Sequence, residues 1–171
     1  MAATVEFNVR EIDAVKRMLA KVSLDSGERQ SFLNIIGDEV ETQTKKRFDT
    51  KLDPAGNTWA ALAQKTLDYY AEEGFAGAMP PLVKKGRLQD SVTYNVEGGS
   101  WSVLVGATME YAATHQFGAT ITPKKAPYLS VPGYGKLKQV TIPARPYLGI
   151  SAGDAGELAD LTALFLARRI K

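Results

Sequence analysis

The pattern that most constrains the fold is a long amphipathic stripe that begins at Asp25 and ends near Phe48. Glu28 follows Asp25 by three residues, which is the spacing of a capping box at the start of a helix. Apolar side chains then recur at helical spacing, namely Phe32, Ile36, Val40 and Phe48. A helix of about 22 residues is about 33 Å long, as long as a small domain is wide. We therefore expect this helix to be the scaffold of the fold.

Two further positions in this stripe carry information. Gly37 lies in its middle and costs about 1 kcal/mol relative to alanine, which counts against one unbroken helix. Glu41 precedes Lys45 by four residues, the spacing of an ion pair on a helix surface.

A second helix is predicted in front of the scaffold helix, from Val9 to about Lys21. Asn8 and Glu11 have capping-box spacing, and Phe7 and Ile12 are spaced as a hydrophobic staple. The apolar stripe of this helix consists of Val9, Ile12, Val15, Leu19 and Val22.

A third helix is predicted after the turn-forming run from Asp53 to Asn57. Its apolar positions are Trp59, Leu62, Ala63, Thr66, Leu67 and Tyr70, and Gly74 is the expected C-terminal cap. Residues 74–85 then contain glycines, prolines and lysines, so we expect a surface loop whose Phe75, Met79 and Leu82 contact a partner.

A β-hairpin is predicted from near Ser91 to Val105. Apolar and polar residues alternate on both sides of Gly98-Gly99, a pair suited to a tight turn. The apolar positions are Val92, Tyr94, Val96, Trp101, Val103 and Val105.

The rest of the chain predicts short elements and one last helix. Residues 110–116 form one or two helical turns that end at Gly118, and two strands flank a loop at 132–135. The strands cover Tyr128 to Val131 and the stretch with Lys138, Val140 and Ile142. Asp154, with Glu157 at the third position, caps the last helix, whose apolar face is Leu158, Leu161, Leu164 and Phe165. Arg168, Arg169 and Lys171 lie in its last turn, where the helix dipole favours positive charge.

Helices and strands are therefore segregated along the chain, which indicates an α+β fold. We expect a small antiparallel sheet packed with a long N-terminal helical region and a C-terminal helix. The 171 residues are enough for a single domain spanning 1–171. The start of the chain lacks a signal-peptide pattern and no apolar run reaches about 18 residues, so we expect synthesis in the cytoplasm and no membrane contact.

Residue chemistry gives little support for catalysis. The chain has no cysteine, which excludes disulfides, zinc–thiolate sites and cysteine nucleophiles. It has one histidine, too few for the usual zinc sites, and no glycine-rich phosphate loop. We therefore expect no catalytic residue, no metal and no cofactor. The acidic groups Asp38, Glu39, Glu41 and Glu72, Glu73 are interpreted as solvated helix faces.

Two hypotheses concern that histidine, His115. As a general base it would activate Ser91 or Ser130 in a small hydrolase, although no elbow motif surrounds either serine. In the alternative, His115 and Gln116 hydrogen-bond the backbone where the short helix meets the sheet.

A basic group lies in the C-terminal half, interleaved with Tyr128 and Tyr134. It consists of Lys124, Lys125, Lys136, Lys138 and Arg145. Such residues are suited to phosphate contacts. They also protect exposed strands or meet acidic rims on protein partners. The net charge is only +2, whereas nucleic-acid-binding domains usually carry a larger basic excess, so the protein-side interpretation is favoured.

Five short segments of this chain match the motifs of one known family in the same order. They are Pro54-x-Gly56-x-x-Trp59-x-x-Leu62, Thr66, Gly86-Arg87-Leu88-x-x-Ser91, Tyr111-Ala112-x-x-His115-Gln116-Phe117-Gly118 and Ile142-Pro143-Ala144-Arg145-Pro146-Tyr147-Leu148-Gly149. From about Phe48 to the C-terminal helix, the chain closely resembles the phage virion morphogenesis family, also called the tail completion proteins. Two departures are Lys85, where the family often has threonine, and residues 119–141, which match no part of the pattern.

The resemblance implies a non-enzymatic structural role in a tailed phage, a prophage or a phage-derived particle. Members of the family finish the tail or join it to the head, and related neck proteins form rings. We therefore expect a homo-oligomeric ring, with a hexamer favoured, whose partners are other neck and tail proteins of the virion. A DNA-contacting head-completion or neck module remains the alternative.

The resemblance also implies roles for single residues. Trp59 and Leu62 would pack the third helix on the sheet, and Gly86 and Gly118 would allow turns that are closed to other residues. Arg145, held extended by Pro146, would pair with a carboxylate of the same or a neighbouring subunit. The expected assembly surfaces are the loops 74–85 and 119–137. The candidate contact residues are Tyr128, Tyr134, Lys136, Lys138 and Arg145.

Overall fold

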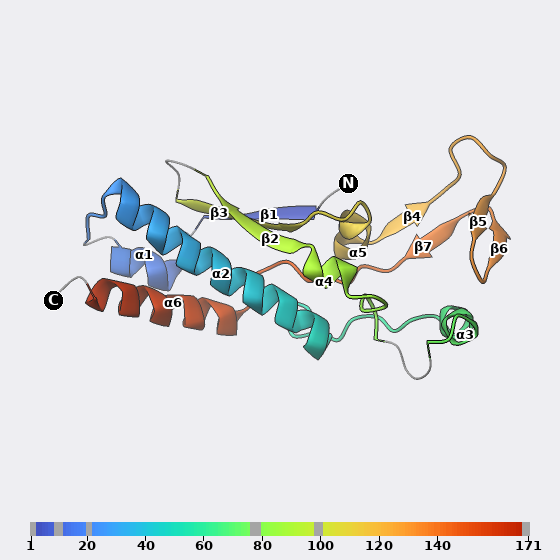
Figure 1. The fold of residues 1–171 in the computed structure, drawn as a ribbon, viewed down its shortest axis with the longest axis horizontal. Coiled ribbons are helices and arrows are strands. Elements are labelled where there is room, and N and C mark those ends of the chain that lie inside the picture. The colour runs from blue at the N-terminus through green and yellow to red at the C-terminus, as the bar shows by residue number, and fades with distance from the viewer. Residues whose placement is uncertain (1–2, 9–11, 20–21, 76–79, 98–100, 169–171) are drawn as a thin grey trace.

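The computed structural model describes residues 3–8, 12–19, 22–75, 80–97 and 101–168. It has the α+β architecture expected from the sequence, with an elongated shape (Figure 1). The helices are α1 Asp13–Leu19, α2 Ser26–Thr50, α3 Gln64–Glu72, α4 Arg87–Asp90, α5 Ala112–Phe117 and α6 Ala152–Ala167. The strands are β1 Ala3–Asn8, β2 Val92–Val96, β3 Ser102–Ala107, β4 Ala119–Ile121, β5 Leu129–Val131, β6 Gly135–Leu137 and β7 Val140–Ile142.

One end of the molecule is a body made of a three-stranded antiparallel sheet and the helices α1, α2 and α6. The sheet has the order β1-β3-β2, and Val105 of β3 lies opposite both Val5 and Tyr94. The predicted hairpin is therefore confirmed as β2 and β3, although its turn, Gly98-Gly99, lies outside the described residues.

Strand β1 was not predicted, and the helix start expected at Asn8 is wrong. Phe7 and Asn8 pair with Val103 and Ser102 of β3, so they belong to a strand. The predicted helix survives as α1, whose Val15 and Leu19 are buried as expected. Residues 9–11 and 20–21 lie outside the described residues. The capping pattern was misleading because pairing with β3, distant in sequence, decides the structure of this segment.

Helix α2 is the scaffold, as predicted, and runs unbroken for 25 residues. Its capping box is present, because Asp25 Oδ1 accepts from Glu28 N at 2.8 Å and Glu28 Oε2 accepts from Asp25 N at 3.0 Å. The predicted ion pair joins Lys45 Nζ to Glu41 at 2.6 Å. Gly37 faces β2, where an added Cβ would lie 2.2 Å from the ring of Tyr94. Glycine is thus used here to let the strand approach the helix closely.

The core lies between α2, the sheet and α6. Phe32 contacts Trp101 and Phe165 with ring centroids 6.3 and 5.3 Å apart, which joins the sheet to α6 through α2. Phe32, Ile36, Val40 and Phe48 are all buried.

The cap of α6 was predicted three residues too late. Ser151 is the N-cap, and Asp154 occupies the third helical position of the capping box. Asp154 also forms an ion pair with Arg47, and both side chains are largely buried. Asp154 therefore joins α6 to α2. Of the predicted apolar face, Leu158 is buried and Leu164 is exposed. Arg169 and Lys171 lie outside the described residues.

The third predicted helix is shorter than expected. It begins at Gln64, so Trp59 and Leu62 precede it in an extended segment. Its predicted end is correct, because Gly74 follows the last turn with a φ of 83°. The predicted turn at 53–57 is present, with Asp53 Oδ1 accepting from the amides of Ala55 and Asn57.

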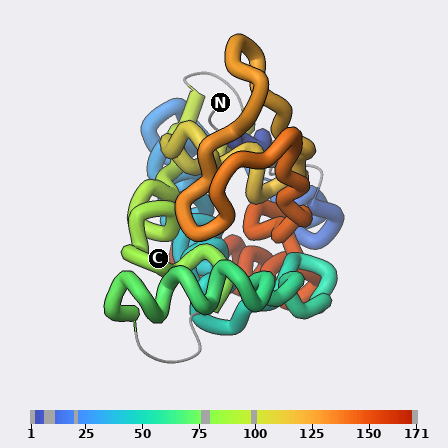
Figure 2. The backbone as a smooth tube through the Cα atoms, turned by 90° about the vertical axis from the view of Figure 1, so that its right-hand side faces the viewer, coloured from blue at the N-terminus to red at the C-terminus, as the bar shows by residue number. Residues whose placement is uncertain are grey.

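The other end of the molecule is an arm formed by β4–β7 (Figure 1). The strands expected at 128–131 and 138–142 are present, but they do not pair with each other. Instead β4 pairs with β7 and β5 with β6. The loop predicted at 119–137 therefore contains three strands, which is a correction to its assignment as a loop. The arm tip, formed by β5 and β6, lies next to α3 (Figure 2). There Tyr134 OH lies 2.7 Å from Thr66 Oγ1.

Candidate functional site

The motif residues expected from the sequence converge on one extended segment, residues 142–149, which leads from β7 of the arm into the body. Gln116 makes the densest contact with it. Its Oε1 accepts from the amides of Tyr147 and Leu148, both at 3.0 Å, and its Nε2 donates to Leu148 O at 3.1 Å. The hypothesis that Gln116 hydrogen-bonds the backbone is therefore confirmed, but its partners lie in residues 147–148 and not in the sheet.

The side chain of Arg145, a residue of this segment, is held by the backbone of residues 60–61. Its Nε donates to Ala60 O at 2.7 Å and its Nη2 to Ala61 O at 3.0 Å, while its own amide donates to His115 O at 2.7 Å. The side chain is 4% exposed. Within the described part of the chain no carboxylate forms an ion pair with Arg145, so the carboxylate partner expected in the same subunit is absent there.

The body anchors the same segment through aromatic and basic side chains. Trp59 Nε1 donates to Pro146 O at 2.8 Å, and Arg47 Nη1 donates to Tyr147 O at 2.9 Å. The rings of Trp59 and Tyr147 both contact Phe48, with centroids 5.4 and 5.3 Å apart. Trp59 thus packs against α2 and residues 142–149, and it does not pack α3 on the sheet as expected.

Two motif glycines allow close approach to this segment. At Gly118, with a φ of 71°, an added Cβ would lie 2.9 Å from the amide nitrogen of Ala144. At Gly149 it would lie 2.5 Å from the ring of Pro54. Gly118 therefore allows a turn that is closed to other residues, as predicted. Pro54 and Gly149, which belong to two different motifs, lie in contact with each other.

The Gly86-Arg87-Leu88 motif does not contact residues 142–149 through these hydrogen bonds and instead forms the start of α4. Gly86 has a φ of 68°, as predicted, and starts the short helix α4. Leu88 is buried, and Ser91 Oγ donates to Leu88 O at 2.8 Å. Gln89 Nε2 donates to Lys45 O at 3.1 Å and so joins α4 to α2. The hydroxyl of Ser91 thus serves the local backbone.

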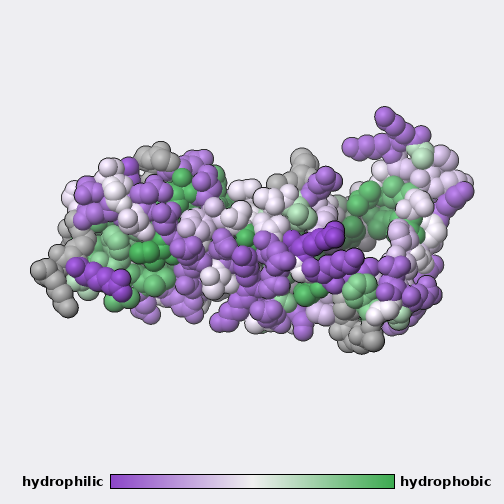
Figure 3. Space-filling model, viewed as in Figure 1, coloured by the Kyte–Doolittle hydropathy of each residue, from purple (hydrophilic) through white to green (hydrophobic). Residues whose placement is uncertain are grey.

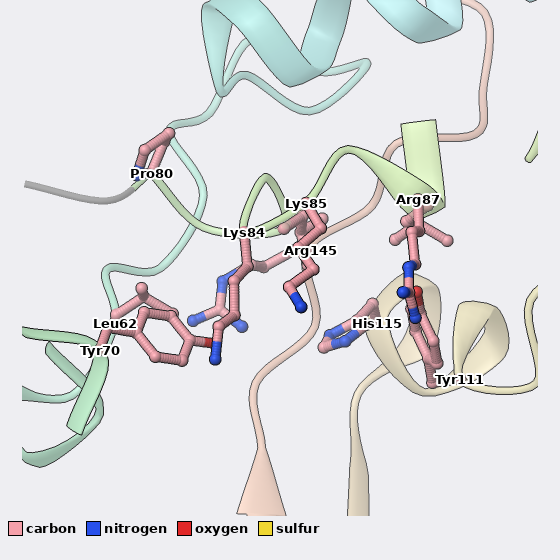
Figure 4. Close-up of a pocket in the computed structure, with 11 residues that line it drawn as sticks. Leu62, Tyr70, Pro80, Lys84, Lys85, Arg87, Tyr111, His115 and Arg145 are labelled. Carbon is pink, nitrogen blue, oxygen red and sulfur yellow. The ribbon is translucent and has the colours of Figure 1, made fainter. Parts of the chain in front are cut away.

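Two adjoining cavities lie between α3, residues 80–87, α5 and the arm. Their volumes are about 330 and 810 Å³, and both are lined by Leu62, Tyr70, Lys84, His115 and Arg145. In Figure 4 the amino group of Lys85 points into the space between Arg145 and His115. Figure 3 shows hydrophobic residues gathered at the base of the arm, beside the hollow that separates the arm from α3. Neither Ser91 nor Ser130 lines these cavities.

Burial controls the electrostatics of this site. It lowers the pKa of His115, and the positive charge of Arg145 lowers it further. Burial also lowers the pKa of Arg145, while Tyr70 partly offsets that effect. His115 Nδ1 is buried and has no hydrogen-bond partner among the described residues. The ring of His115 does contact Tyr111, with centroids 5.7 Å apart. A backbone role for the imidazole is therefore not observed.

Sequence reasoning missed Lys84. Its Nζ lies 4.1 Å from the ring centroid of Tyr70, 5.0 Å from that of Phe75 and 5.2 Å from that of Tyr69. These cation–π contacts hold residues 80–85, a segment of turns and bends, against α3. The three aromatic residues Tyr69, Tyr70 and Phe75, close together in the sequence, were the feature from which a cation–π partner could have been predicted. Of the expected loop 74–85, residues 76–79, including Met79, lie outside the described residues, whereas Leu82 packs against the core.

The candidate assembly residues fall into two groups. Tyr128 is 45% exposed, and Lys136 and Lys138 are exposed on the arm. Tyr134 contacts α3 and Arg145 is buried, so these two side chains serve contacts within the chain. Phe117 is a motif residue with no such internal role, since 66% of its surface is exposed.

No group of three potential metal ligands occurs among the described residues. In the same part of the chain, no helix has the length and apolar character needed to cross a membrane.

A family model described as the phage virion morphogenesis family matches residues 10–167. No curated protein and no solved structure matches the chain. The matched range includes all the motif residues that surround residues 142–149.

Proposed function

Because this chain belongs to the phage virion morphogenesis family, we propose that it completes the tail of a phage particle or joins the tail to the head at the neck. It acts through protein–protein contacts, as a subunit of a ring, and a hexamer is the favoured form. In this role the protein is a structural part of the virion and not an enzyme.

The observation that carries the proposal is how the motif residues are used. Gln116, Trp59 and Arg145 direct their hydrogen bonds to the backbone of the chain itself. They hold residues 142–149, and β7 at the start of this segment is the root of the arm. The motif residues thus hold the base of the arm in place, and their role is structural.

The exposed arm supplies the contact surface. Tyr128, Lys136 and Lys138 are exposed on it. Aromatic side chains are enriched at protein interfaces, and the rims of such interfaces are polar, which suits Tyr128 beside the two lysines. We call these three residues the arm surface. An acidic rim on a neighbouring subunit, or on another neck or tail protein, is its complement.

The experiment replaces Lys136 and Lys138 with serine in a phage that encodes this chain. Lys16→Ser with Lys46→Ser is the matched control, because these lysines are exposed on helices of the body. We expect the arm variant to fold normally, by circular dichroism and thermal unfolding, but to yield separate heads and tails in electron micrographs. The control should yield joined, infectious particles.

Two results would contradict the proposal. Joined particles at the normal number with the arm variant would exclude the arm surface. One copy of the chain per virion, counted by quantitative mass spectrometry, would exclude the ring.

A second function, contact with the packaged DNA at the neck, is favoured by the exposed pair Lys124 and Lys125 on the arm. Affinity for DNA that falls steeply with salt would support it, since phosphate contacts release counterions. Absence of binding at low salt would remove it.

A further inference from the structure

The cavities beneath the arm have an unbalanced charge. Five of their lining side chains carry a basic nitrogen, and the linings contain no aspartate or glutamate among the described residues. These side chains are Lys84, Lys85, Arg87, His115 and Arg145. A site with several cations and no internal anion favours a negatively charged ligand.

Arg145 is the buried member of this group of positive charges. Its guanidinium is buried with only carbonyl oxygens as acceptors, and Nη1 donates to none of the described residues. A buried charge without a counter-ion is unfavourable. A carboxylate beside it would restore the balance, and the planar guanidinium is well matched to carboxylate geometry.

His115 adds a second unsatisfied group in the same place. Its ring lines both cavities, and its Nδ1 is buried without a partner in the described chain. Burial and Arg145 disfavour the protonated ring, and a bound anion would stabilise it.

The walls of the larger cavity are mainly apolar. They include Leu62, Val131, Leu137, Val140 and Ile142. Apolar walls suit aliphatic side chains, whereas the backbone of a nucleic acid offers phosphates and sugars and is usually met by an open basic surface. A volume of about 810 Å³ lies within the range of sites that enclose a ligand.

We infer that the two adjoining cavities together bind a short protein segment in which carboxylates alternate with aliphatic side chains. A carboxylate lies near Arg145, Lys85 and His115, and the aliphatic side chains lie against the walls of the larger cavity. That the segment belongs to a neighbouring protein of the particle rests on the proposed function. The binding chemistry rests on the cavities alone.

The test uses the full chain and the ring signals of His115 in nuclear magnetic resonance. His115 is the only histidine, so its signals are unambiguous. The probe is the acetylated and amidated peptide Leu-Glu-Leu-Glu-Leu, and its neutral match is Leu-Gln-Leu-Gln-Leu. We expect the acidic peptide to shift the His115 signals saturably, to raise the pKa of His115, and to bind about tenfold more tightly than the neutral peptide.

Two double variants assign the effect to the cavities. Lys85→Gln with Arg87→Gln removes two exposed cations of the lining without touching the buried contacts of Arg145. Lys16→Gln with Lys46→Gln removes two exposed cations of the body. We expect the first variant to weaken the acidic peptide about tenfold and the second to leave it unchanged.

Three outcomes would overturn the inference. These are no shift of the His115 signals at millimolar peptide, equal affinity for the two peptides, or tighter binding of a hexathymidylate strand than of the acidic peptide. Lys136 and Lys138 line neither cavity, so the particle experiment tests the arm surface independently. Joined particles with a failed peptide test would reject the acidic segment and leave the role in the tail intact.

Discussion

The side-chain amide of Gln116 forms two hydrogen bonds with one residue, Leu148, accepting from its amide at 3.0 Å and donating to its carbonyl at 3.1 Å. The same Oε1 accepts from Tyr147 N at 3.0 Å, and Gln116 is 6% exposed. A helix of the family motif is thus joined to the segment that supports the arm. Gln116 therefore contacts backbone groups of residues 147–148 and none of their side chains through these hydrogen bonds.

Replacing Gln116 with methionine should lower the free energy of unfolding by more than about 3 kcal/mol, since each buried group left without a partner costs about 1–3 kcal/mol. Urea denaturation followed by circular dichroism measures this. Gln30→Met, at an exposed position of α2, is the matched control and should have little effect. A loss below about 1 kcal/mol for Gln116→Met would show that these hydrogen bonds are dispensable.

Gly37→Ala should destabilise the protein although alanine is the better helix former. The gain of about 1 kcal/mol in helix propensity is outweighed by overpacking against Tyr94, which costs about 1–3 kcal/mol. In a Tyr94→Ala background the same substitution should become stabilising, because the obstructing ring is gone. If Gly37→Ala had the same effect in both backgrounds, the close contact between α2 and β2 would not explain the glycine.

Glu39 should make stability depend on pH. Burial and then the neighbouring Glu157 raise the pKa of Glu39 above 4.5 in the folded protein. The folded state therefore binds the proton more readily than the unfolded chain, and this stabilisation is present below pH 4.5 and lost as the pH rises through the higher folded pKa.

Glutamine at position 39 does not titrate, so the Glu39→Gln variant does not lose stability by this route. The free energy of unfolding of the variant, relative to that of the parent protein, should therefore increase as the pH rises from about 4 to about 7. Urea denaturation across that range measures the difference. Glu157→Gln, which removes the neighbouring charge, should reduce the pH dependence that Glu39 confers. A difference between Glu39→Gln and the parent that stays constant with pH would refute the assignment.

The contact between Tyr134 and Thr66 should hold the arm tip on α3. The chain has no cysteine, so spin labels attach only where cysteine is introduced. The two substitutions are Lys136→Cys and Glu72→Cys, both at exposed positions. We expect a narrow distance distribution that broadens when Tyr134 is replaced by alanine. Tyr128→Ala, an exposed aromatic of the same arm, is the control and should keep the narrow distribution. Broadening by the control alone would contradict the contact.

Local patterns predicted the parts of the fold that local interactions decide. The capping box at Asp25 and the stripe through Phe32 predicted α2, and alternation around Val103 predicted β2 and β3. Strand β1 was missed because its structure depends on pairing with β3, about a hundred positions later in the chain. Likewise, β4 and β6 are three-residue strands whose partners alone make them strands.

The candidate site was predicted in its residues but not in its arrangement. The motifs contained Gln116, Trp59 and Arg145, yet their partners are backbone groups of Leu148, Pro146 and Ala60, which leave no mark on the sequence. Within the described chain, carbonyl oxygens accept hydrogen bonds from Arg145 and no carboxylate pairs with it, whereas the carboxylate expected from a neighbouring subunit stays a prediction. The unpaired charge of the cavities follows from this arrangement and was visible only in the structure.

The measurement that tests the account most directly is electron microscopy of particles assembled without this chain. The role in completing the tail predicts that cells lacking it accumulate full heads and separate tails, and that supplying the chain restores joined particles. Joined, infectious particles formed in its absence would contradict the account.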